Sequence, residues 1–192
     1  NDDNPQRKQY LAIIGRQTDN LSGQIKSILK PYALSGLTDD FEKKDIKVVE
    51  KLSAIVDQAK LAFPGIVFGL RTDAPADTVI QANETMFDEM LGNILQNAIK
   101  YSPENPCIEV SLSDTPANEI ISIKDNGTGI PQDKIKHLFE RYYKVEKLSS
   151  TPGYGIGLNY VKQVADLHHW LLEVESRVGE GSTFSIIIPK NR

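Results

Sequence analysis

Residues 119–131 read EIISIKDNGTGIP, and this stretch decides the fold. Apolar and polar residues alternate at Ile121-Ser122-Ile123, which is the period of a strand with one buried face. Asp125 follows at the end of that strand, and the glycines at positions 127 and 129 open a turn. The pattern therefore predicts an acidic side chain at the edge of a sheet, beside backbone that carries no side chains.

The turn after Asp125 has two interpretations. One is purely structural: a tight turn closed by an Asx hydrogen bond. The other is a binding site, in which the carboxylate accepts a hydrogen bond from an adenine amine. Glycines without side chains would let the base lie against the backbone.

A second motif lies upstream, on a helix expected from about residue 84 to 101. Glu89, Asn93 and Asn97 are four residues apart and project from one face of this helix. Lys100 and Tyr101 add an ammonium and a phenol at its end. An amide oxygen beside a cation suits a magnesium-bound polyphosphate, because Mg²⁺ takes few protein oxygens and prefers phosphates and water.

Two glycine-rich segments follow downstream. Residues 153–158 read GYGIGL and lead directly into an apolar-periodic helix, whose first N–H groups form a natural anion site. The segment does not match GxGxxG or GxxxxGK[ST]. Residues 179–184 read GEGSTF and by themselves predict a hairpin turn between the last two strands.

The elements around these motifs mix strands and helices. Strands are expected at 41–44, 66–72, 78–81, 107–113, 119–125, 171–176 and 183–188, and helices at 46–62, 84–101, 135–143 (short) and 156–168. We expect neighbouring strands to pair antiparallel. The class is therefore α+β, a two-layer sandwich of a mixed sheet packed against helices.

A long amphipathic helix is expected before this sandwich, from about residue 6 to 34. Apolar residues recur there at intervals of three, four and seven, and residues 35–40 (SGLTDD) break the pattern. A lone helix of this length is marginal in water, so we expect a partner helix that is partly missing from the chain. We place a domain boundary near residue 38, between residues 1–37 and 38–192.

Composition excludes several classes of protein. The 192 residues carry a net charge of −4, which gives no support for nucleic-acid binding, since that needs a clustered basic face. The single cysteine, Cys107, cannot form an internal disulfide, and no apolar run approaches the roughly 18 residues of a membrane span. Because the chain begins at Asn1 without a signal peptide pattern, we expect it to be cut from a longer protein.

In this order and spacing the motifs resemble those of the ATP-binding domain of sensor histidine kinases. This superfamily also includes gyrase and MutL-type ATPases. The likeness runs from about residue 40 to the end: an N box at 93–101, glycine boxes at 125–129 and 153–157, and an F box at 138–144 (LFERYYK).

The resemblance implies a mixed sheet on one side, helices on the other, and ATP between helices under a mobile lid at about 131–152. It implies catalytic roles for Asn97 and Lys100, with Asn97 as the magnesium ligand and Asp125 as the adenine partner. Lys144 stands where the family often has arginine, so a point charge replaces a bidentate fork. The residues implied in binding ATP and Mg²⁺ are Asn93, Asn97, Lys100, Tyr101, Asp125, Gly127, Gly129, Ile130, Lys144, Gly153, Tyr154, Gly155, Ile156, Gly157, Leu158 and Thr183.

The N-terminal helix resembles the second helix of the dimerisation and phosphotransfer hairpin of such kinases. The first helix, with its phospho-accepting histidine, is not in the chain, and the neighbours of His137, His168 and His169 do not match that motif. We interpret His137 as a surface residue of the lid, and His168 and His169 as helix-end residues.

The partners implied are that histidine hairpin and a response regulator receiver domain, and a homodimer through the N-terminal helix stays open. We expect no nucleic acid partner. The expected location is the cytoplasm, and the full-length protein could be anchored in the bacterial inner membrane.

Two rival functions share these motifs. A gyrase or MutL-type ATPase hydrolyses ATP with a glutamate one helical turn before the magnesium asparagine. That position here is Asn93, and a carboxamide does not take up a proton near neutral pH. The second rival is a nucleotide-binding module without transfer activity. The function expected is an ATP-dependent protein histidine kinase that positions the γ-phosphate for attack by an imidazole.

Overall fold

The computed structural model describes residues 9, 10, 14, 34, 41–103, 105–145 and 155–190. Their elements are β1 (Lys44–Lys47), α2 (Val48–Ala62), β2 (Val67–Thr72), β3 (Val79–Ala82), α3 (Glu84–Lys100), β4 (Cys107–Asp114), β5 (Asn118–Asp125), α4 (Gln132–Ile135), α5 (Gly157–His168), β6 (Leu171–Arg177) and β7 (Gly181–Pro189). The expected N-terminal helix lies outside the described residues apart from four positions, of which Tyr10 and Ile14 are exposed and Leu34 is buried.

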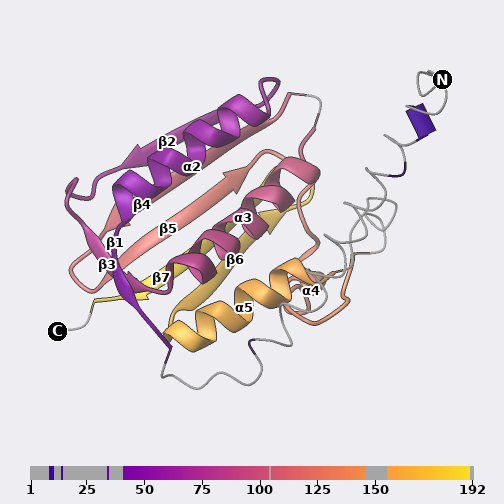
Figure 1. Ribbon diagram of the computed structural model, residues 1–192. Coiled ribbons are helices and arrows are strands. Elements are labelled where there is room, and N and C mark those ends of the chain that lie inside the picture. Colours follow the sequence, from indigo (N-terminus) through magenta and orange to yellow (C-terminus); the bar gives the residue numbers. More distant parts are fainter. Residues whose placement is uncertain are drawn as a thin grey trace.

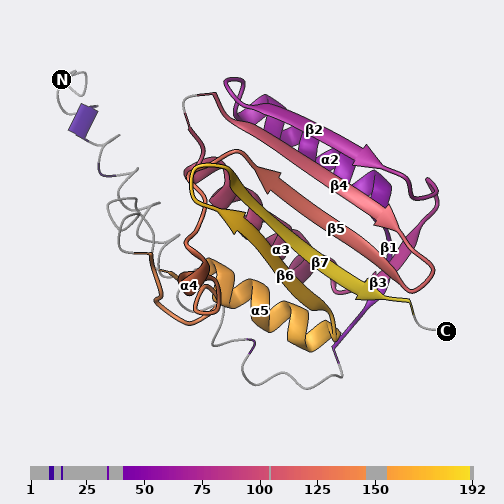
Figure 2. The same ribbon diagram turned by 180° about the vertical axis from the view of Figure 1, so that it is seen from behind.

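Five strands form one sheet in the order β2-β4-β5-β7-β6. Helices α2, α3 and α5 cover one face of this sheet, and the view from behind shows the strands without a second helical layer (Figures 1 and 2). A separate antiparallel pair, β1 and β3, lies at the end of the sandwich where α3 begins. The expected α+β two-layer architecture with a mixed sheet is confirmed.

One strand pair differs from the expectation of antiparallel neighbours. β2 and β4 run parallel, with Phe68 opposite Ile108, because β3 and α3 carry the chain back across the sheet between them. The β4–β5, β5–β7 and β6–β7 pairs are antiparallel. The expectation was therefore wrong for the edge strand β2 alone.

The core forms because each element places one apolar face toward the other layer. In α2 the buried residues Val48, Leu52, Val56 and Ala59 are spaced by four, four and three. In β5 every second residue is buried, including Ile121 and Ile123. Side chains from all three long helices meet those of the strands in one continuous cluster.

Two expected elements lie at shifted positions. The first strand, expected at 41–44, forms at Lys44–Lys47 because Ile46 pairs with Ile80 of β3 and is buried there. The short helix expected at 135–143 forms at Gln132–Ile135. After it the chain turns by backbone hydrogen bonds that span three residues, such as the N–H of Leu138 to the carbonyl of Ile135 at 3.2 Å.

Specific residues mark the start of α3 and the end of α5. Asn83 caps α3, since its side-chain oxygen accepts a hydrogen bond from the N–H of Met86 at 3.1 Å. His168 is the last residue of α5 and is buried, and His169 ends the helix with a left-handed backbone at φ 59°. Among the described residues no helix has the length and apolar character to cross a membrane.

Candidate functional site

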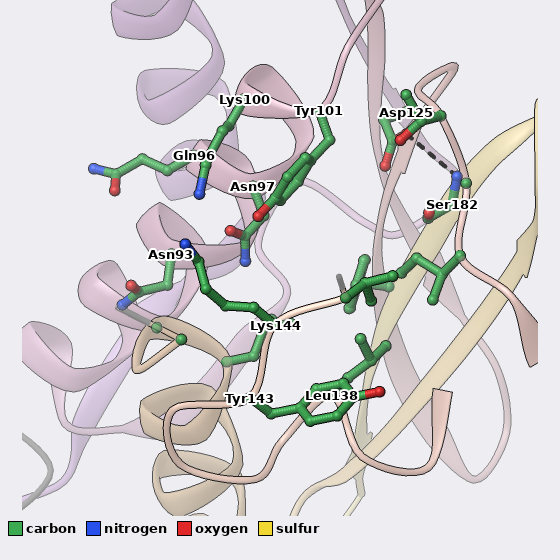
Figure 3. A pocket seen from close by; sticks show the side chains of 18 residues that line it. Asn93, Gln96, Asn97, Lys100, Tyr101, Asp125, Leu138, Tyr143, Lys144 and Ser182 are labelled. Atoms are coloured by element: carbon green, nitrogen blue, oxygen red, sulfur yellow. Dashed lines mark hydrogen bonds between the residues drawn. The ribbon is translucent and has the colours of Figure 1, made fainter. Parts of the chain in front are cut away.

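A cavity of about 230 Å³ lies at the end of the sandwich where α3 ends and α5 begins (Figure 3). Five segments form it: the last turns of α3, the loop after β5, residues 138–145, the first turn of α5 and the start of β7. The residues that line it are Asn93, Gln96, Asn97, Lys100, Tyr101, Asp125, Thr128, Gly129, Ile130, Leu138, Tyr143, Lys144, Val145, Gly155, Gly157, Leu158, Ser182 and Phe184.

Asp125 forms the buried polar end of this cavity. It is 6% exposed, because the alternation of β5 turns it toward the helices like Ile123 two residues before. One carboxylate oxygen, Oδ1, accepts hydrogen bonds from the N–H groups of Gly127 at 2.7 Å and Ser182 at 3.3 Å. Burial nevertheless raises the pKa of Asp125 above its ordinary value.

The loop after Asp125 is packed too closely for side chains. A methyl group on Gly127 would lie 2.5 Å from the carbonyl oxygen of Tyr101, and one on Gly129 would lie 1.9 Å from that of Arg177. Gly129 also has φ +67°, which favours glycine. The N–H of Thr128 donates to the carbonyl of Tyr101 at 3.1 Å, so this loop is fixed to the end of α3.

The last turns of α3 supply amides and a cation to the opposite end of the cavity. Asn93, Asn97 and Lys100 lie on one face of the helix and line the cavity together. The side-chain amide of Asn93 donates to the carbonyl of Glu89 at 2.8 Å. The ammonium of Lys100 lies 4.7 Å from the centre of the Tyr101 ring, within cation–π range.

The first turn of α5 approaches the same face of α3. A methyl group on Gly157 would lie 2.7 Å from Oδ1 of Asn93, so a larger residue here would displace the Asn93 side chain. Gly157 and Leu158 line the cavity at this N-terminus, where the first N–H groups of a helix have no partner within the helix. The position suits an anion.

Residues 138–145 form the remaining wall. Leu138, Tyr143, Lys144 and Val145 line the cavity. The Lys100 and Lys144 side chains reach from different elements into the space beside Asn97 (Figure 3). The lid expected at 131–152 is a statement about motion and stays a prediction, and its residues 146–152 lie outside those described.

Most residues implied in binding come together in this one cavity. Asn93, Asn97, Lys100, Tyr101, Asp125, Gly129, Ile130, Lys144, Gly155, Gly157 and Leu158 all line it. Gly127 does not line the cavity but contacts Asp125 and Tyr101, which do. Ile156 is buried and is the residue that precedes α5. Gly153 and Tyr154 lie outside the described residues.

Thr183 is the expected residue that lies on the face of the sheet away from the cavity. Side chains alternate along β7, so Ser182 and Phe184 face the helices while Thr183 lies on the other face of the sheet. The sequence held a signal for this. Ile186 and Ile188 show that every second residue of the strand faces the core, and Ser182 belongs to the same alternating set whereas Thr183 does not.

Other lining residues were also absent from the expected set. Gln96, Thr128, Tyr143 and Val145 each stand next to an expected residue, and Leu138 lies in the expected F box. Which side chains beside a motif face a cavity depends on the local turn, and the turns of residues 136–143 are not α-helical. Periodicity therefore had no basis for choosing among them.

Glu89 lies on the same face of α3 as Asn93 and Asn97 but has another role. Its carboxylate oxygen Oε2 accepts a hydrogen bond of 2.5 Å from the hydroxyl of Tyr160 on α5. Tyr160 is buried, and burial together with this carboxylate raises the pKa of the phenol. The pair joins the two helices one turn beyond the cavity.

A family model described as "Histidine kinase-, DNA gyrase B-, and HSP90-like ATPase" matches residues 82–192. Among curated relatives, the sensor-like histidine kinase SenX3 of Mycobacterium tuberculosis is 29% identical over 190 residues, which is 98% of this chain and 46% of that protein. The chain thus spans about half the length of this relative.

Two solved structures extend the likeness to the fold. Full-length ShkA in complex with AMPPNP matches 97% of this chain and 39% of its own, with a TM-score of 0.84 and 19% identity. The histidine kinase ThkA in complex with the response regulator protein TrrA matches 100% of this chain and 53% of its own, with a TM-score of 0.70 and 24% identity.

Proposed function

Because the chain belongs to the histidine kinase-, DNA gyrase B- and HSP90-like ATPase family, we propose that its cavity binds Mg-ATP for phosphoryl transfer to a histidine. The chain would be the catalytic part of a two-component sensor histidine kinase. In support, its curated relatives include sensor kinases, and ShkA has the same fold and was solved with AMPPNP.

One observation carries the proposal: the two ends of the cavity differ in chemistry. A buried carboxylate, Asp125, stands at one end with glycine backbone beside it. Asn97, Lys100 and Lys144 stand at the other. A nucleoside triphosphate has the matching polarity, since its adenine amine donates hydrogen bonds and its phosphates carry negative charge.

The donor set also fits magnesium. Within the part of the chain that the structure describes, no three His, Cys, Asp or Glu side chains are grouped to hold a metal. Mg²⁺ does not require such a cage, because it keeps waters and binds through one or two protein oxygens plus phosphates. The side-chain oxygen of Asn97 would be its ligand, and the bound ion would offset phosphate charge.

In this proposal the chain's residues position ATP rather than activate a nucleophile. Phosphoryl transfer is catalysed mostly by positioning and charge neutralisation. Lys100 and Lys144 would hold the phosphates, and Asp125 would fix the base at the far end. No general base is required in the domain, because the attacking imidazole belongs to the hairpin.

Transfer is favoured over hydrolysis by the position that precedes Asn97 by one helical turn. It holds Asn93, whose amide donates to the carbonyl of Glu89 and cannot accept a proton from water. The nearest carboxylate on that face is Glu89, and the Tyr160 hydroxyl is bonded to it. A gyrase-type ATPase would need a carboxylate at the position of Asn93.

The partners proposed are the histidine hairpin of the same kinase and a response regulator receiver domain that accepts the phosphoryl group. ThkA was solved with its response regulator, which supports the second partner by analogy. We keep residues 1–37 as the second helix of the hairpin, and with it dimerisation. The cytoplasm, where ATP is available, is the proposed location.

The test combines binding with transfer. Calorimetric titration should show Mg-ATP bound more tightly than Mg-GTP, because guanine presents an acceptor where adenine has its amine. Adding the kinase's own histidine hairpin and ATP labelled at the γ-phosphate should yield acid-labile phosphate on the hairpin. Binding without any transfer would favour the module that only holds nucleotide.

Asn97→Ala provides the matched variant. We expect it to abolish transfer while adenosine still binds, because the adenine end of the cavity does not depend on the metal. The helix should persist, since alanine has the higher helix propensity. Circular dichroism on the same preparation checks the fold, and full transfer by a folded Asn97→Ala protein would show that magnesium is held elsewhere.

A further inference from the structure

Asn159, in the first turn of α5, is bonded to the segment that precedes Lys144. Its side-chain amide Nδ2 donates to the carbonyl of Phe139 at 2.8 Å. Its oxygen Oδ1 accepts from Nε of Arg141 at 3.2 Å and from the amide of Gln163, one turn further along α5, at 2.9 Å. Both ends of the amide are used, which fixes its orientation.

The same segment is held a second time through its backbone. The N–H of Tyr142 donates to the carbonyl of Gly155 at 2.9 Å. Tyr142 has φ 64°, which is unusual for a residue with a bulky side chain, and such backbone persists only where its surroundings impose it. A methyl group on Gly155 would lie 2.6 Å from the carbonyl oxygen of Tyr143, so the backbone at Gly155 is in close contact with the backbone at residues 142–143.

These contacts lie just before the side chains that enter the cavity. Residues 136–142 make turns rather than a regular helix or strand, and their own backbone bonds are short-range, such as that from the N–H of Glu140 to the carbonyl of His137 at 3.0 Å. Tyr143 and Lys144 follow directly and line the cavity wall opposite α3. The contacts that hold residues 139–142 therefore contribute to the direction in which the Lys144 side chain leaves the backbone.

We propose that Asn159 is a positioning residue, which holds residues 139–141 so that the Lys144 ammonium stands beside Asn97 at the phosphate end of the cavity. Asn159 does not line the cavity itself, so its effect on the ligand passes through Lys144. This role rests on the proposed function, because it assumes that the cavity binds a nucleoside triphosphate. It adds a residue outside the glycine boxes to the binding machinery.

A double-mutant cycle on nucleotide affinity tests the proposal, with Asn159→Ala, Lys144→Ala and the combined variant titrated with Mg-ATP and with adenosine. Loss of a charge-assisted contact to phosphate should weaken Mg-ATP binding about tenfold in Lys144→Ala. Asn159→Ala should also weaken Mg-ATP binding. The combined variant should be no weaker than Lys144→Ala alone, since Asn159 has nothing left to position.

Adenosine affinity separates positioning from general damage. It should stay within about twofold of wild type in both single variants, because Asp125 and its loop are unchanged. Lys162→Ala is the control on the same helix, since the Lys162 ammonium pairs with Asp166 one turn along, and it should leave both affinities unchanged. Asn159→Asp keeps the acceptor but sets an oxygen against the Phe139 carbonyl, and it should reproduce the Asn159→Ala effect.

The outcomes distinguish the two proposals. A wild-type chain that binds neither Mg-ATP nor adenosine would overturn the proposed function. A wild type that binds both, with effects of Asn159→Ala and Lys144→Ala that add in the combined variant, would overturn only the positioning role. Loss of adenosine and Mg-ATP affinity by the same factor in Asn159→Ala would also overturn it, since this indicates damage to the whole cavity.

Discussion

At the scale of single residues, Asp125 combines the binding role proposed for it with a cost to stability. The carboxylate is buried, and burial raises its pKa, so the ionised form is less favourable in the folded chain than in the unfolded one. Its contribution to stability is therefore present at low pH and is lost as pH rises through the raised pKa. The hydrogen bonds from Gly127 and Ser182 offset this only in part.

We expect Asp125→Asn to weaken Mg-ATP binding while it stabilises the ligand-free protein near pH 7. Binding should fall roughly 10- to 150-fold, the value of a charge-assisted hydrogen bond of about 1.5 to 3 kcal/mol. Stability should rise because a buried charge is removed. Calorimetry and urea unfolding on one preparation measure both, and a variant that is destabilised and binds normally would exclude the adenine role.

The buried ring of His168 is bonded to two backbone groups. Its Nε2 accepts from the N–H of Asn83 at 3.1 Å and its Nδ1 donates to the carbonyl of Val164 at 2.8 Å. These partners place the ring proton on Nδ1. Burial first, and then the neighbouring Lys43 and His169, lower the pKa of His168, although the bond to Val164 opposes the shift.

The lowered pKa predicts that acid destabilises the fold. Between the folded pKa of His168 and the ordinary value of about 6.5, the unfolded chain binds more protons, so the free energy of unfolding falls as pH falls below about 6.5. In His168→Gln this pH dependence should be smaller, and in His137→Gln, at a partly exposed histidine, it should remain. Urea midpoints from pH 8 to 5 measure it. Equal slopes in wild type and His168→Gln would contradict the assignment.

At the scale of elements, two glycines with left-handed backbone provide a matched comparison. Gly129 has φ +67° and its absent side chain would meet Arg177, whereas Gly179 has φ +84° and open space around it. Gly179→Ala should cost only the backbone term of about 1 kcal/mol. Gly129→Ala should cost on the order of 3 kcal/mol, because the loop must also move, and it should weaken nucleotide binding. Thermal unfolding of the two variants checks this, and equal losses would mean that backbone strain alone matters.

The elements also show how much of the fold can be predicted from the sequence. The period of two in β5 and the period of 3.6 in α3 identified the elements that carry Asp125 and Asn97, because local burial sets both periods. The parallel pairing of β2 with β4 could not be read from either strand, since it depends on the path of the chain between them. The turns of residues 136–143 could not be predicted for a related reason, because they are bonded to Asn159 and Gly155, which are distant in sequence.

At the scale of the whole molecule, the family match begins at residue 82, inside the folded unit. Residues 44–80 supply β1, α2, β2 and the first half of β3, and they bury Val48, Leu52, Val56 and Phe68 in the shared core. Each such side chain contributes about 1.5 to 3 kcal/mol. The sum is comparable with the whole net stability of a domain, about 5 to 15 kcal/mol.

A fragment of residues 82–192 should therefore fail to fold, whereas residues 41–192 should unfold in one cooperative transition. The shorter fragment would also leave β4 as an uncovered edge. Circular dichroism during heating measures both. A cooperative transition in the 82–192 fragment would contradict this, since it would show that these residues fold without α2 and β2.

The last strand, β7, lies inside the sheet between β5 and β6 rather than at an edge. During synthesis on the ribosome, one side of β5 therefore stays unpaired until residues 181–189 have emerged, and Asp125 lacks the N–H of Ser182 until then. The cavity is completed only after β7 has been synthesised, because Ser182 and Phe184 line it. A chain that stops before residue 181 would have no such cavity and would present the bare edge of β5 to chaperones and proteases.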